Sequence, residues 1–568
     1  MTSGASAGEL GWGGRVVLIA GVVAALALVS APLLLLFTAA FRGPGDRLPF
    51  EPGAVWSLEH VRTIFENAAL YQHTARDTLL FVCGAVAVTF VVAFALAWLV
   101  ERTDLPARST VFGLILVPML VPTVMISIAW IQLFGPNAGW LNVALRAVVG
   151  GESGPMNIFT LPGLVVCQAA VLVPFEFLLL SATLRTMNPA LEEASTMSGA
   201  SPLVTFRRIT WAVLQPGILA PLMLALLVAF EQFDLPLMIG VPAGIDVFST
   251  RIFYELNPDS GLPVYGRAAA VALPFLGVGV ALLTIYNRLV RHADRYVTIT
   301  SRGYRVLRYS LRRWRWPAIV LVWSYLCVAT VLPVIALVGT SIVGNAPLST
   351  SMLQHATLDA YRTVIADPTF ARAVANTIVV ATLSAIVVTA VGVLLAWIVV
   401  RTRVVGRTLV DIISVVSIGI PSVIAGLATM ILYLSAPIPI YGTIWILVLA
   451  YSYRLAVSTR ISRSGLMQIG RELEHASAVS GARWSTTIRR IVLPLIAPSL
   501  ATSFVLLFIV GIREFTLGMV LGSRDNMVLG VMLWRFFEDG HAAEAAAIAT
   551  MLVVSMAPVG LVARRAAA

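Results

Sequence analysis

The chain contains no lysine, so all 39 of its basic residues are arginine. A nucleotide-binding loop of the Walker A type needs a lysine that reaches the phosphates. The chain therefore cannot carry a conventional P-loop. If ATP hydrolysis drives its function, the hydrolysis must take place on a separate subunit.

Cysteine and histidine are also scarce. The three cysteines, Cys83, Cys167 and Cys327, all lie within apolar runs, where a buried thiol acts as a small hydrophobic group. This placement argues against a disulfide framework and against a metal cluster. The six histidines are scattered, and no His/Asp/Glu group has metal-ligand spacing or resembles a catalytic cluster. We therefore expect no bound cofactor, no metal site and no enzymatic activity.

Charge is the third deficit, since only 12% of the 568 residues are charged while 59% are hydrophobic. A soluble protein has about a quarter of its residues charged. A membrane span needs about 20 apolar residues. Runs of this kind predict about twelve spans, near residues 16 to 41, 78 to 100, 110 to 134, 160 to 184, 211 to 235, 267 to 287, 317 to 340, 377 to 400, 409 to 434, 441 to 460, 492 to 520 and 543 to 563.

The arginines predict the orientation of these spans. The segment from Arg288 to Arg315 holds nine arginines and one acid, Asp294, and "RTRVVGR" at 401 to 407 holds three arginines and no acid. The positive-inside rule places both segments in the cytoplasm, which also puts both termini there. Segments 42 to 76, 240 to 266, 341 to 375 and 522 to 542 are then external. The rule accounts for the basic segment without nucleic acid, so we expect no nucleic-acid partner.

A repeat divides the chain into two related parts. "EEASTMSGASPLVTFRRI" at 192 to 209 returns as "EHASAVSGARWSTTIRRI" at 474 to 491, and residues 192–216 match 474–498 at 11 of 25 positions. Upstream, "AWLVERT" at 97 to 103 matches "AWIVVRT" at 396 to 402, and Pro122 matches Pro421. The offset is 282 residues at the first match and 299 at the second, so the first half holds 17 extra residues between these points.

The sequence therefore predicts an all-α polytopic membrane protein with two homologous six-helix halves of the same orientation. We assign residues 1–290 to the first unit, 291–316 to a basic cytoplasmic linker and 317–568 to the second unit. The repeated polar loops, about residues 188–210 and 470–492, lie on the cytoplasmic side between the fourth and fifth spans of their halves. Each begins with acids that suit a helix N-terminus, continues through small residues and is broken at Gly199 or Gly481.

These loops resemble the E-A-A-x3-G-x9-I-x-L-P loop of binding-protein-dependent ABC importer permeases. The second copy has Ile491, Leu493 and Pro494 at the spacings of that pattern, and the first copy has Ile209. His475 stands at the glutamate position of the second copy, and Trp211 replaces the leucine in the first. The resemblance implies that the loops dock on a cytoplasmic ATPase through Glu192, Glu193, Ala194, Ser195, Gly199, Ala200, Glu474, His475, Ala476, Ser477, Gly481 and Ala482.

The same resemblance implies a fused two-unit permease in the plasma (inner) membrane of a bacterial-type cell. Two loops imply two copies of an ABC ATPase. An extracytoplasmic solute-binding protein would deliver the substrate, and lipid would surround the spans. The segments around "FEQFDLPLMIGVPAGIDVFSTRIFYEL" and "REFTLGMVL" resemble the ferric-iron permease group, so ferric iron is the expected substrate. Thiamine, phosphonate and polyamine permeases are similar, and these substrates stay open.

Charged residues within spans suggest a translocation path. An ionisable group at membrane depth costs about 2.5 to 3.5 kcal/mol and usually faces a cavity or a partner. Glu176 and Arg454 are two such residues, and the remaining candidates for the path are Glu231, Gln232, Asp234, Arg513 and Glu514. An ion pair that serves only assembly would explain the same charges. An ion-coupled secondary transporter would also explain them and often has two six-span halves, but it leaves the repeated loop unexplained.

Overall fold

The computed structural model describes residues 12–43, 50–150, 154–186, 190–258, 262–293, 308–344, 356–404, 406–436 and 438–567. Within these ranges almost all regular structure is helical, which confirms the all-α expectation. Two short antiparallel strands, β1 (Arg42–Gly43) and β2 (Val55–Trp56), are the exception. Residues 188–189 of the first repeated loop and 294–307 of the basic linker lie outside the described residues.

The first half follows one path from α1 to α13. Its helices are, in order, α1 (Trp12–Ala25), α2 (Ala31–Ala39), α3 (Glu59–Glu66), α4 (Ala68–Arg102), α5 (Arg108–Leu116), α6 (Thr123–Phe134), α7 (Trp140–Val149), α8 (Leu161–Thr186), α9 (Ala190–Met197), α10 (Pro202–Thr205), α11 (Trp211–Glu231), α12 (Phe248–Leu256) and α13 (Tyr265–Ala293).

The second half repeats this order with few changes. Its helices are α14 (Arg315–Leu326), α15 (Leu332–Val343), α16 (Asp359–Ala366), α17 (Pro368–Arg401), α18 (Arg407–Val416), α19 (Ser422–Ser435), α20 (Ile444–Tyr451), α21 (Leu455–Gln468), α22 (Arg471–Val479), α23 (Trp484–Thr487), α24 (Leu493–Arg513), α25 (Thr516–Leu521), α26 (Leu529–Glu538) and α27 (Ala542–Ala567). α7 has no counterpart among the described residues of this half, and it lies in the stretch where the first half is longer.

Seven described helices are long and apolar enough to cross a membrane, or up to twelve if each bent pair counts as one span. Several expected spans are therefore broken. The helices on either side of Pro122 meet at 101°, and those on either side of its repeat equivalent Pro421 meet at 115°. Proline lacks the amide proton that would continue the helix. A further bent pair, Pro236–Ala243 with Phe248–Leu256, lies mostly in the segment 240 to 266, which the arginine pattern predicts to be external.

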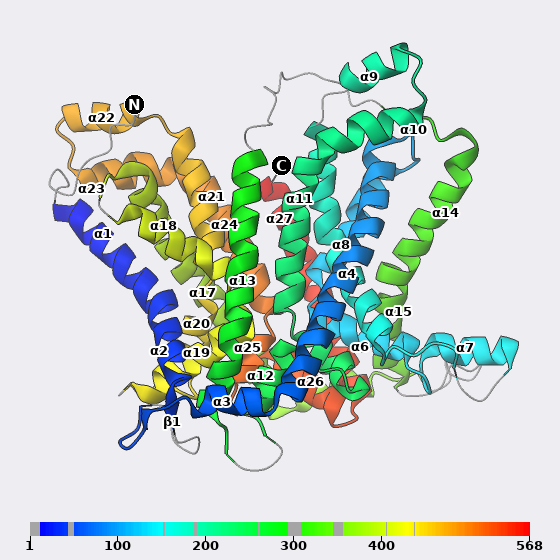
Figure 1. The fold of residues 1–568 in the computed structure, drawn as a ribbon, viewed down its shortest axis with the longest axis horizontal. Helices are drawn as coiled ribbons and strands as arrows, with labels where there is room; N and C mark the ends of the chain where they lie inside the picture. The colour runs from blue at the N-terminus through cyan, green and yellow to red at the C-terminus, as the bar shows by residue number, and fades with distance from the viewer. Residues whose placement is uncertain are drawn as a thin grey trace.

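The termini and the repeated loops lie at one end of the molecule. Figure 1 places N, C, α9 and α22 at the top, while α3, α12 and α26 lie at the opposite end. By the arginine rule the top is cytoplasmic. The start of α1 and the end of α27 thus lie on the same side as α9 and α22, as the predicted topology requires.

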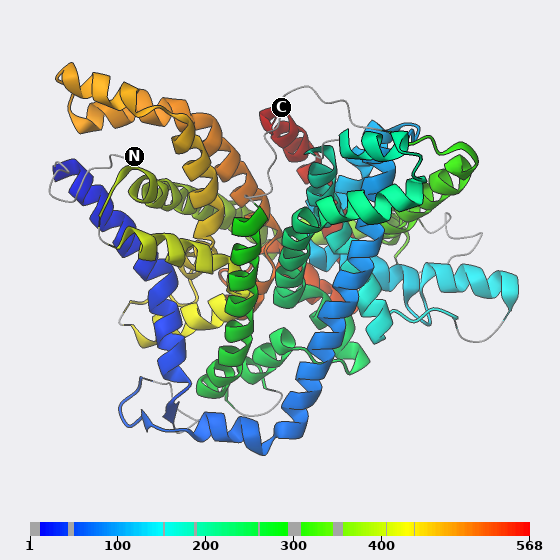
Figure 2. The same cartoon turned by 45° about the horizontal axis from the view of Figure 1, so that its top comes forward.

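The first span of each half lies against the other half. α1 packs against α17 and α2 against α19, while α15 packs against α6 of the first half as well as against α27 of its own half. In Figures 1 and 2 the blue α1 and α2 therefore run beside the yellow helices of the second half. The two sequence units are thus interleaved in space.

The described end of the linker is fixed to the first half. Tyr309 donates a backbone hydrogen bond to the carbonyl of Arg102 (2.8 Å). The Leu311 N–H (2.9 Å) and the Ser310 hydroxyl (3.1 Å) both donate to the Asp104 carboxylate, and these bonds lower the pKa of Asp104. The linker therefore covers the cytoplasmic end of α4.

Candidate functional site

The repeated loops form two short helices, α9 and α22, that end in the same way. Gly199 and Gly481 follow them with φ of +80° and +78°, a left-handed conformation that glycine adopts without steric cost. The next residues, Ala200 and Ala482, each donate a backbone hydrogen bond of 3.1 Å into the preceding helix. The glycines thus stop both helices at equivalent positions.

An arginine–glutamate ion pair holds each helix to the end of a long span. Arg102, the last residue of α4, pairs with Glu192, and both side chains are fully buried. The Glu192 carboxylate also accepts a hydrogen bond from Thr210 (2.6 Å). In the second half, Arg401 at the end of α17 pairs with Glu474 at 2.8 Å. The two pairs occupy equivalent positions of the repeat.

Other contacts behind the helices are also duplicated. The hydroxyls of Ser195 and Thr205 are 2.9 Å apart, and those of their equivalents Ser477 and Thr487 are 2.8 Å apart. The equivalent tryptophans Trp98 and Trp397 each contact an aromatic ring edge-on, Phe206 at 5.1 Å and Trp484 at 5.5 Å between centroids. Both helices are therefore supported on their inner side by an equivalent serine–threonine pair and an equivalent tryptophan.

The outer faces carry exposed apolar groups at matching positions. Met197 is 91% exposed and its equivalent Val479 is 89% exposed. Leu191 and Leu473 form a second exposed pair near the start of the two helices. Glu193 and His475, which differ between the copies, are exposed too. Exposed apolar side chains on a water-facing surface are typical of a protein interface.

The structure therefore divides the predicted loop residues into two groups. Glu193, Ala194, and His475 face outward, whereas Glu192 is buried and supports α9 from inside. Sequence reasoning missed the arginine partners, although the repeat aligns "ERT" at 101–103 with "VRT" at 400–402. Their shared position at the end of a span was the available sign.

A second candidate site lies where α11 and α24 end. α11 ends at Glu231 and α24 at Arg513, and the following residues, Gln232 and Glu514, have extended backbone. Hydrogen bonds then fix the turns, since the Ser249 hydroxyl donates to the Gln232 carbonyl (2.7 Å) and the Leu517 N–H donates to the Glu514 carboxylate (3.1 Å). The predicted spans 211 to 235 and 492 to 520 are therefore interrupted at equivalent positions.

Two pairs of equivalent residues contact each other at these breaks. The rings of Phe233 and Phe515 lie 6.2 Å apart and nearly parallel. The Thr516 hydroxyl donates to the Asp234 carboxylate at 3.0 Å. Both pairs are separated by 282 residues, which is the offset of the repeat. A residue can contact its own equivalent only beside the axis that relates the halves, so this contact marks the axis.

Charged side chains surround the axial contact. Arg454, at the break between α20 and α21, pairs with Glu514 at 2.5 Å and donates to the Ser422 hydroxyl at 2.8 Å. Glu231 is close enough to interact electrostatically with Arg454, Glu514 and Asp234. Arg513 interacts with Asp234 and Glu514. The structure thus brings together all the charged path candidates except Glu176. We call Glu231, Asp234, Arg454, Arg513 and Glu514 the axial cluster.

Glu176 is separate from the axial cluster. Its carboxylate is fully buried in α8, and neither oxygen has a hydrogen-bond partner among the described residues. Across the described part of the chain, no group of three or more His, Cys, Asp or Glu side chains is arranged to hold a metal ion. The axial carboxylates therefore do not form a preassembled metal site.

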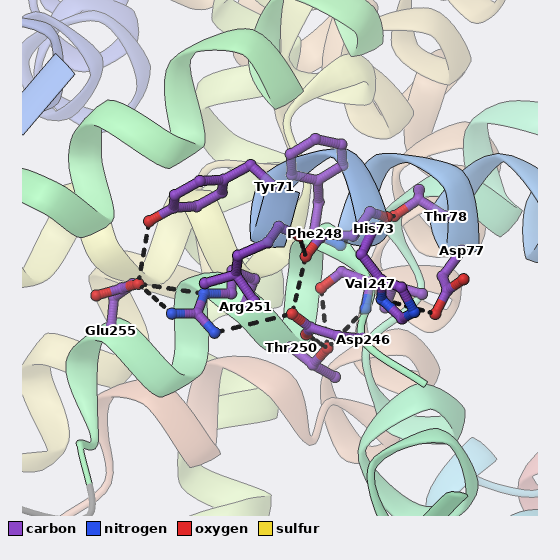
Figure 3. A network of polar contacts seen from close by, with 12 residues as sticks. Tyr71, His73, Asp77, Thr78, Asp246, Val247, Phe248, Thr250, Arg251 and Glu255 are labelled. Atoms are coloured by element: carbon purple, nitrogen blue, oxygen red, sulfur yellow. Dashed lines mark hydrogen bonds and ion pairs between the residues drawn. The ribbon is translucent and has the colours of Figure 1, made fainter. Parts of the chain in front are cut away.

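A polar network occurs at the extracytoplasmic end of the first half (Figure 3). Glu255 of α12 is buried and accepts hydrogen bonds from Arg251 (2.8 Å), Tyr71 (3.3 Å) and Arg267 of α13. Beside it, the Thr74 hydroxyl donates to Asp246 at 2.9 Å. The network ties α12 to α4 and α13.

The second half keeps the backbone anchor of this region but not its charges. The Phe248 N–H donates to Thr78 (3.1 Å), and the Leu529 N–H donates to the equivalent Thr377 (2.8 Å). Counted from the helix start, the positions of Arg251 and Glu255 in α12 are those of Met532 and Phe536 in α26. The same scaffold is therefore held by ion pairs in one half and by apolar packing in the other.

Comparison with known proteins identifies the family. The profile described as "Binding-protein-dependent transport system inner membrane component" matches the chain twice, over residues 89–296 and 389–568. The two matches agree with the two halves of the repeat.

Two relatives that match most of the chain are named as ferric transport proteins. The chain is 24% identical over 514 residues to "Ferric transport system permease protein FbpB" of Actinobacillus pleuropneumoniae, covering 89% of this chain and 73% of the relative. It is 23% identical to "Fe(3+)-transport system permease protein FbpB 2" of Haemophilus influenzae, covering 84% and 86%. A solved bacterial alginate ABC transporter aligns with a TM-score of 0.40 at 17% identity, over 51% of this chain and 96% of that one.

The family, the helices and the topology give one consistent description. The protein is a multi-pass component of the inner membrane. It is a transport subunit and not an enzyme, and its family works with an ATPase and a solute-binding protein. This excludes the ion-coupled secondary transporter. With two copies of the family domain over most of its length, the chain belongs to the binding-protein-dependent ABC importer permeases, as a fused two-unit member.

Proposed function

We propose that the protein moves ferric iron across the inner membrane, driven by two copies of an ABC ATPase and supplied by an extracytoplasmic iron-binding protein. One ATPase docks on α9 and the other on α22. The substrate passes along the axis between the halves, through the axial cluster.

The proposed number of ATPase copies rests on a duplicated clamp, the pairs Arg102–Glu192 and Arg401–Glu474. Both α9 and α22 are held by an arginine–glutamate pair and present an exposed apolar side chain, Met197 or Val479, at the same position. A small-faced helix with an exposed apolar group suits a cleft in a partner. Two equivalent surfaces on one chain fit two equivalent partners.

The substrate is inferred from the relatives. Two relatives that match 89% and 84% of the chain are named as ferric transport permeases. A third that matches 90% of the chain is named only as a probable ABC transporter permease. Phosphonate is the second candidate, because a permease named for 2-aminoethylphosphonate is 26% identical over 168 residues, which is 29% of this chain. Nothing in the chain favours thiamine or polyamine over these two.

Copurification tests the docking sites. The tagged chain is expressed with the ATPase and binding protein encoded beside it, and native mass spectrometry counts the ATPase copies. Met197→Arg or Val479→Arg should each leave one copy bound, and the double variant none. Leu262→Arg, at a position that is 74% exposed on the extracytoplasmic side, is the control and should retain both. A single copy bound to the unaltered chain would contradict the proposal.

Uptake tests the substrate. Proteoliposomes that contain the complex are given radioactive ferric iron on the binding protein, with ATP on the cytoplasmic side. Iron should cross the membrane only with ATP. Transport of 2-aminoethylphosphonate without iron transport would replace the proposed substrate, and uptake that follows an ion gradient without ATP would refute the mechanism.

A further inference from the structure

The two halves contribute equivalent positions to the axial contact, but the side chains at several of these positions differ in charge. Phe233 and Phe515 are identical across the axis, but the charged positions around them are not. Glu231 is equivalent to Arg513, and Asp234 is equivalent to Thr516. The charges at the axis therefore arose from differences between the halves and are not a by-product of duplication.

The charges also do not balance. The axial cluster contains three carboxylates, Glu231, Asp234 and Glu514, and two guanidinium groups, Arg454 and Arg513. Uncompensated charge at membrane depth is unfavourable, so the arginines stabilise the carboxylates when nothing else is present. Only the Arg454–Glu514 pair is in direct contact among the described charged groups of the cluster. The Nε of Arg513 is buried without a hydrogen-bond partner among the described residues.

A small cavity of about 10 Å³ lies beside Arg454, between α17, α24 and the break of α20 and α21, and this volume is about that of one water molecule. Its lining is partly polar, with Ser384 and Tyr451, and partly apolar, with Ala385, Val388, Leu507 and Val510. At the equivalent positions of the first half, Arg454 is replaced by Leu172 and Tyr451 by Ala169. Arg454 and the Tyr451 hydroxyl beside it are therefore features of the second half alone.

Ferric iron is a hard cation, and hard cations prefer oxygen ligands such as carboxylates. On the axis, ferric iron would meet carboxylates that already interact with the guanidinium groups of Arg454 and Arg513. We propose that Glu231, Asp234 and Glu514 determine specificity for a cationic substrate, and that Arg454 and Arg513 are built-in counter-ions that the substrate displaces as it passes. This inference rests on the proposed function, since it requires a cation as the substrate.

The exchange replaces one cationic partner of Glu514 by another. Before substrate arrives, Arg454 pairs with Glu514. When the cation contacts the carboxylates, Arg454 releases Glu514, and the pair forms again when the cation leaves. No bond is made or broken other than ionic contacts and hydrogen bonds.

Neutral substitutions separate this role from a structural one. Uptake of iron from the loaded binding protein is measured in proteoliposomes for Glu231→Gln, Asp234→Asn and the double variant Arg454→Gln/Glu514→Gln. The double variant removes a buried pair without leaving a lone charge, so it should fold. If the pair serves assembly only, the double variant transports normally. On our proposal it transports at least about tenfold more slowly with unchanged thermal stability, as do the two single variants.

Arg454→Gln alone gives the converse result. Without its counter-ion Glu514 should hold the cation longer, so the KM for iron falls together with the maximal rate. Size-exclusion chromatography and melting temperature confirm that each variant is folded. Normal uptake by all the carboxylate variants would overturn the inference while leaving the proposed function intact. If the unaltered complex carries 2-aminoethylphosphonate and no iron, the proposed substrate fails, and this inference fails with it.

Discussion

The cytoplasmic clamps of α9 and α22 are the same pair of residues in two different environments. Arg102 and Glu192 are completely buried, whereas the side chains of Arg401 and Glu474 are 7% and 22% exposed. The difference comes from the linker, because Tyr309 stacks on Trp98 at 6.0 Å and covers the first clamp. A fused chain has one linker, so only one clamp is covered in this way.

The two halves share some features and differ in others. Two contacts behind the helices are equivalent in both halves, the arginine–glutamate pair and the serine–threonine pair, while the exposed positions, such as Glu193 and His475, have diverged. At the axis and at the extracytoplasmic end, the backbone anchors are likewise retained and the charges differ. The first half holds its α12 with ion pairs, and the second half holds α26 with apolar side chains.

The largest expected difference is between the two clamps. Arg102→Ala leaves Glu192 buried and unpaired, which should lower the free energy of unfolding by about 3 to 5 kcal/mol. Arg401→Ala should cost less, about 1.5 to 3 kcal/mol, because water reaches Glu474. Thermal unfolding in detergent measures both. Arg62→Ala, which removes a pair with Glu66 that is exposed on both sides, is the control and should have a minor effect. Equal losses at Arg102 and Arg401 would show that linker cover is irrelevant.

The extracytoplasmic network should matter in one half only. Glu255→Gln weakens hydrogen bonds from two arginines, so we expect a loss of about 2 kcal/mol in the free energy of unfolding. The matched change in the second half is Phe536→Leu, which alters only apolar packing and should cost less than about 1.5 kcal/mol. The same melting assay compares them. A larger loss for the phenylalanine variant would reverse our assignment of what holds α12 and α26.

The helix-terminating glycines should behave identically. Gly199 and Gly481 both have positive φ, and no atom lies within 4 Å of the place that an alanine methyl group would take, so only backbone conformation opposes a side chain there. Gly199→Ala and Gly481→Ala should each cost about 1 kcal/mol. Hydrogen exchange of α9 and α22 would report the local loosening. A clear difference between the two would mean that one helix end has a contact beyond the chain's own backbone.

The smallest effect on stability is expected at the diverged outer positions. Glu193→His and His475→Glu are surface changes and should alter the free energy of unfolding by less than about 0.5 kcal/mol. Their effect should appear instead in ATPase binding, measured by titration of the ATPase onto each variant. If His475→Glu strengthens binding and Glu193→His weakens it, the two docking contacts are unequal in the unaltered protein. If neither substitution changes ATPase binding, the apolar side chains alone make the contact.

Much of the architecture follows from patterns that the sequence carries locally. Apolar runs place the spans, arginines orient them, and the repeated loop positions α9 and α22. Pro122 and Pro421 are visible in the sequence, but the apolar runs continue through them and conceal the bends. The end of α11 at Glu231 is hidden for the same reason. Hydropathy indicates whether a segment lies in lipid or in water, but it does not indicate the direction of the helix axis.

Contacts between distant segments could not be predicted in the same way. Arg102 and Glu192 are 90 positions apart, and only the fold shows that they meet. The family pattern places Glu192 among the docking residues, yet its side chain is buried and points inward. By contrast, the repeat offset allows equivalent residues to be paired, and the structure then shows which of these pairs lie on the axis.

The central claim is that substrate passes along the axis marked by Asp234 and Thr516. In a chain whose three cysteines are replaced by serine, Asp234→Cys with Thr516→Cys places two thiols where the native side chains are 3.0 Å apart. Oxidation should link them and stop the residual ATP-driven iron uptake, and a reductant should restore it. Each single cysteine variant is the control and should be insensitive to oxidant. Uptake that continues unchanged through a fully formed cross-link would contradict a path along this axis.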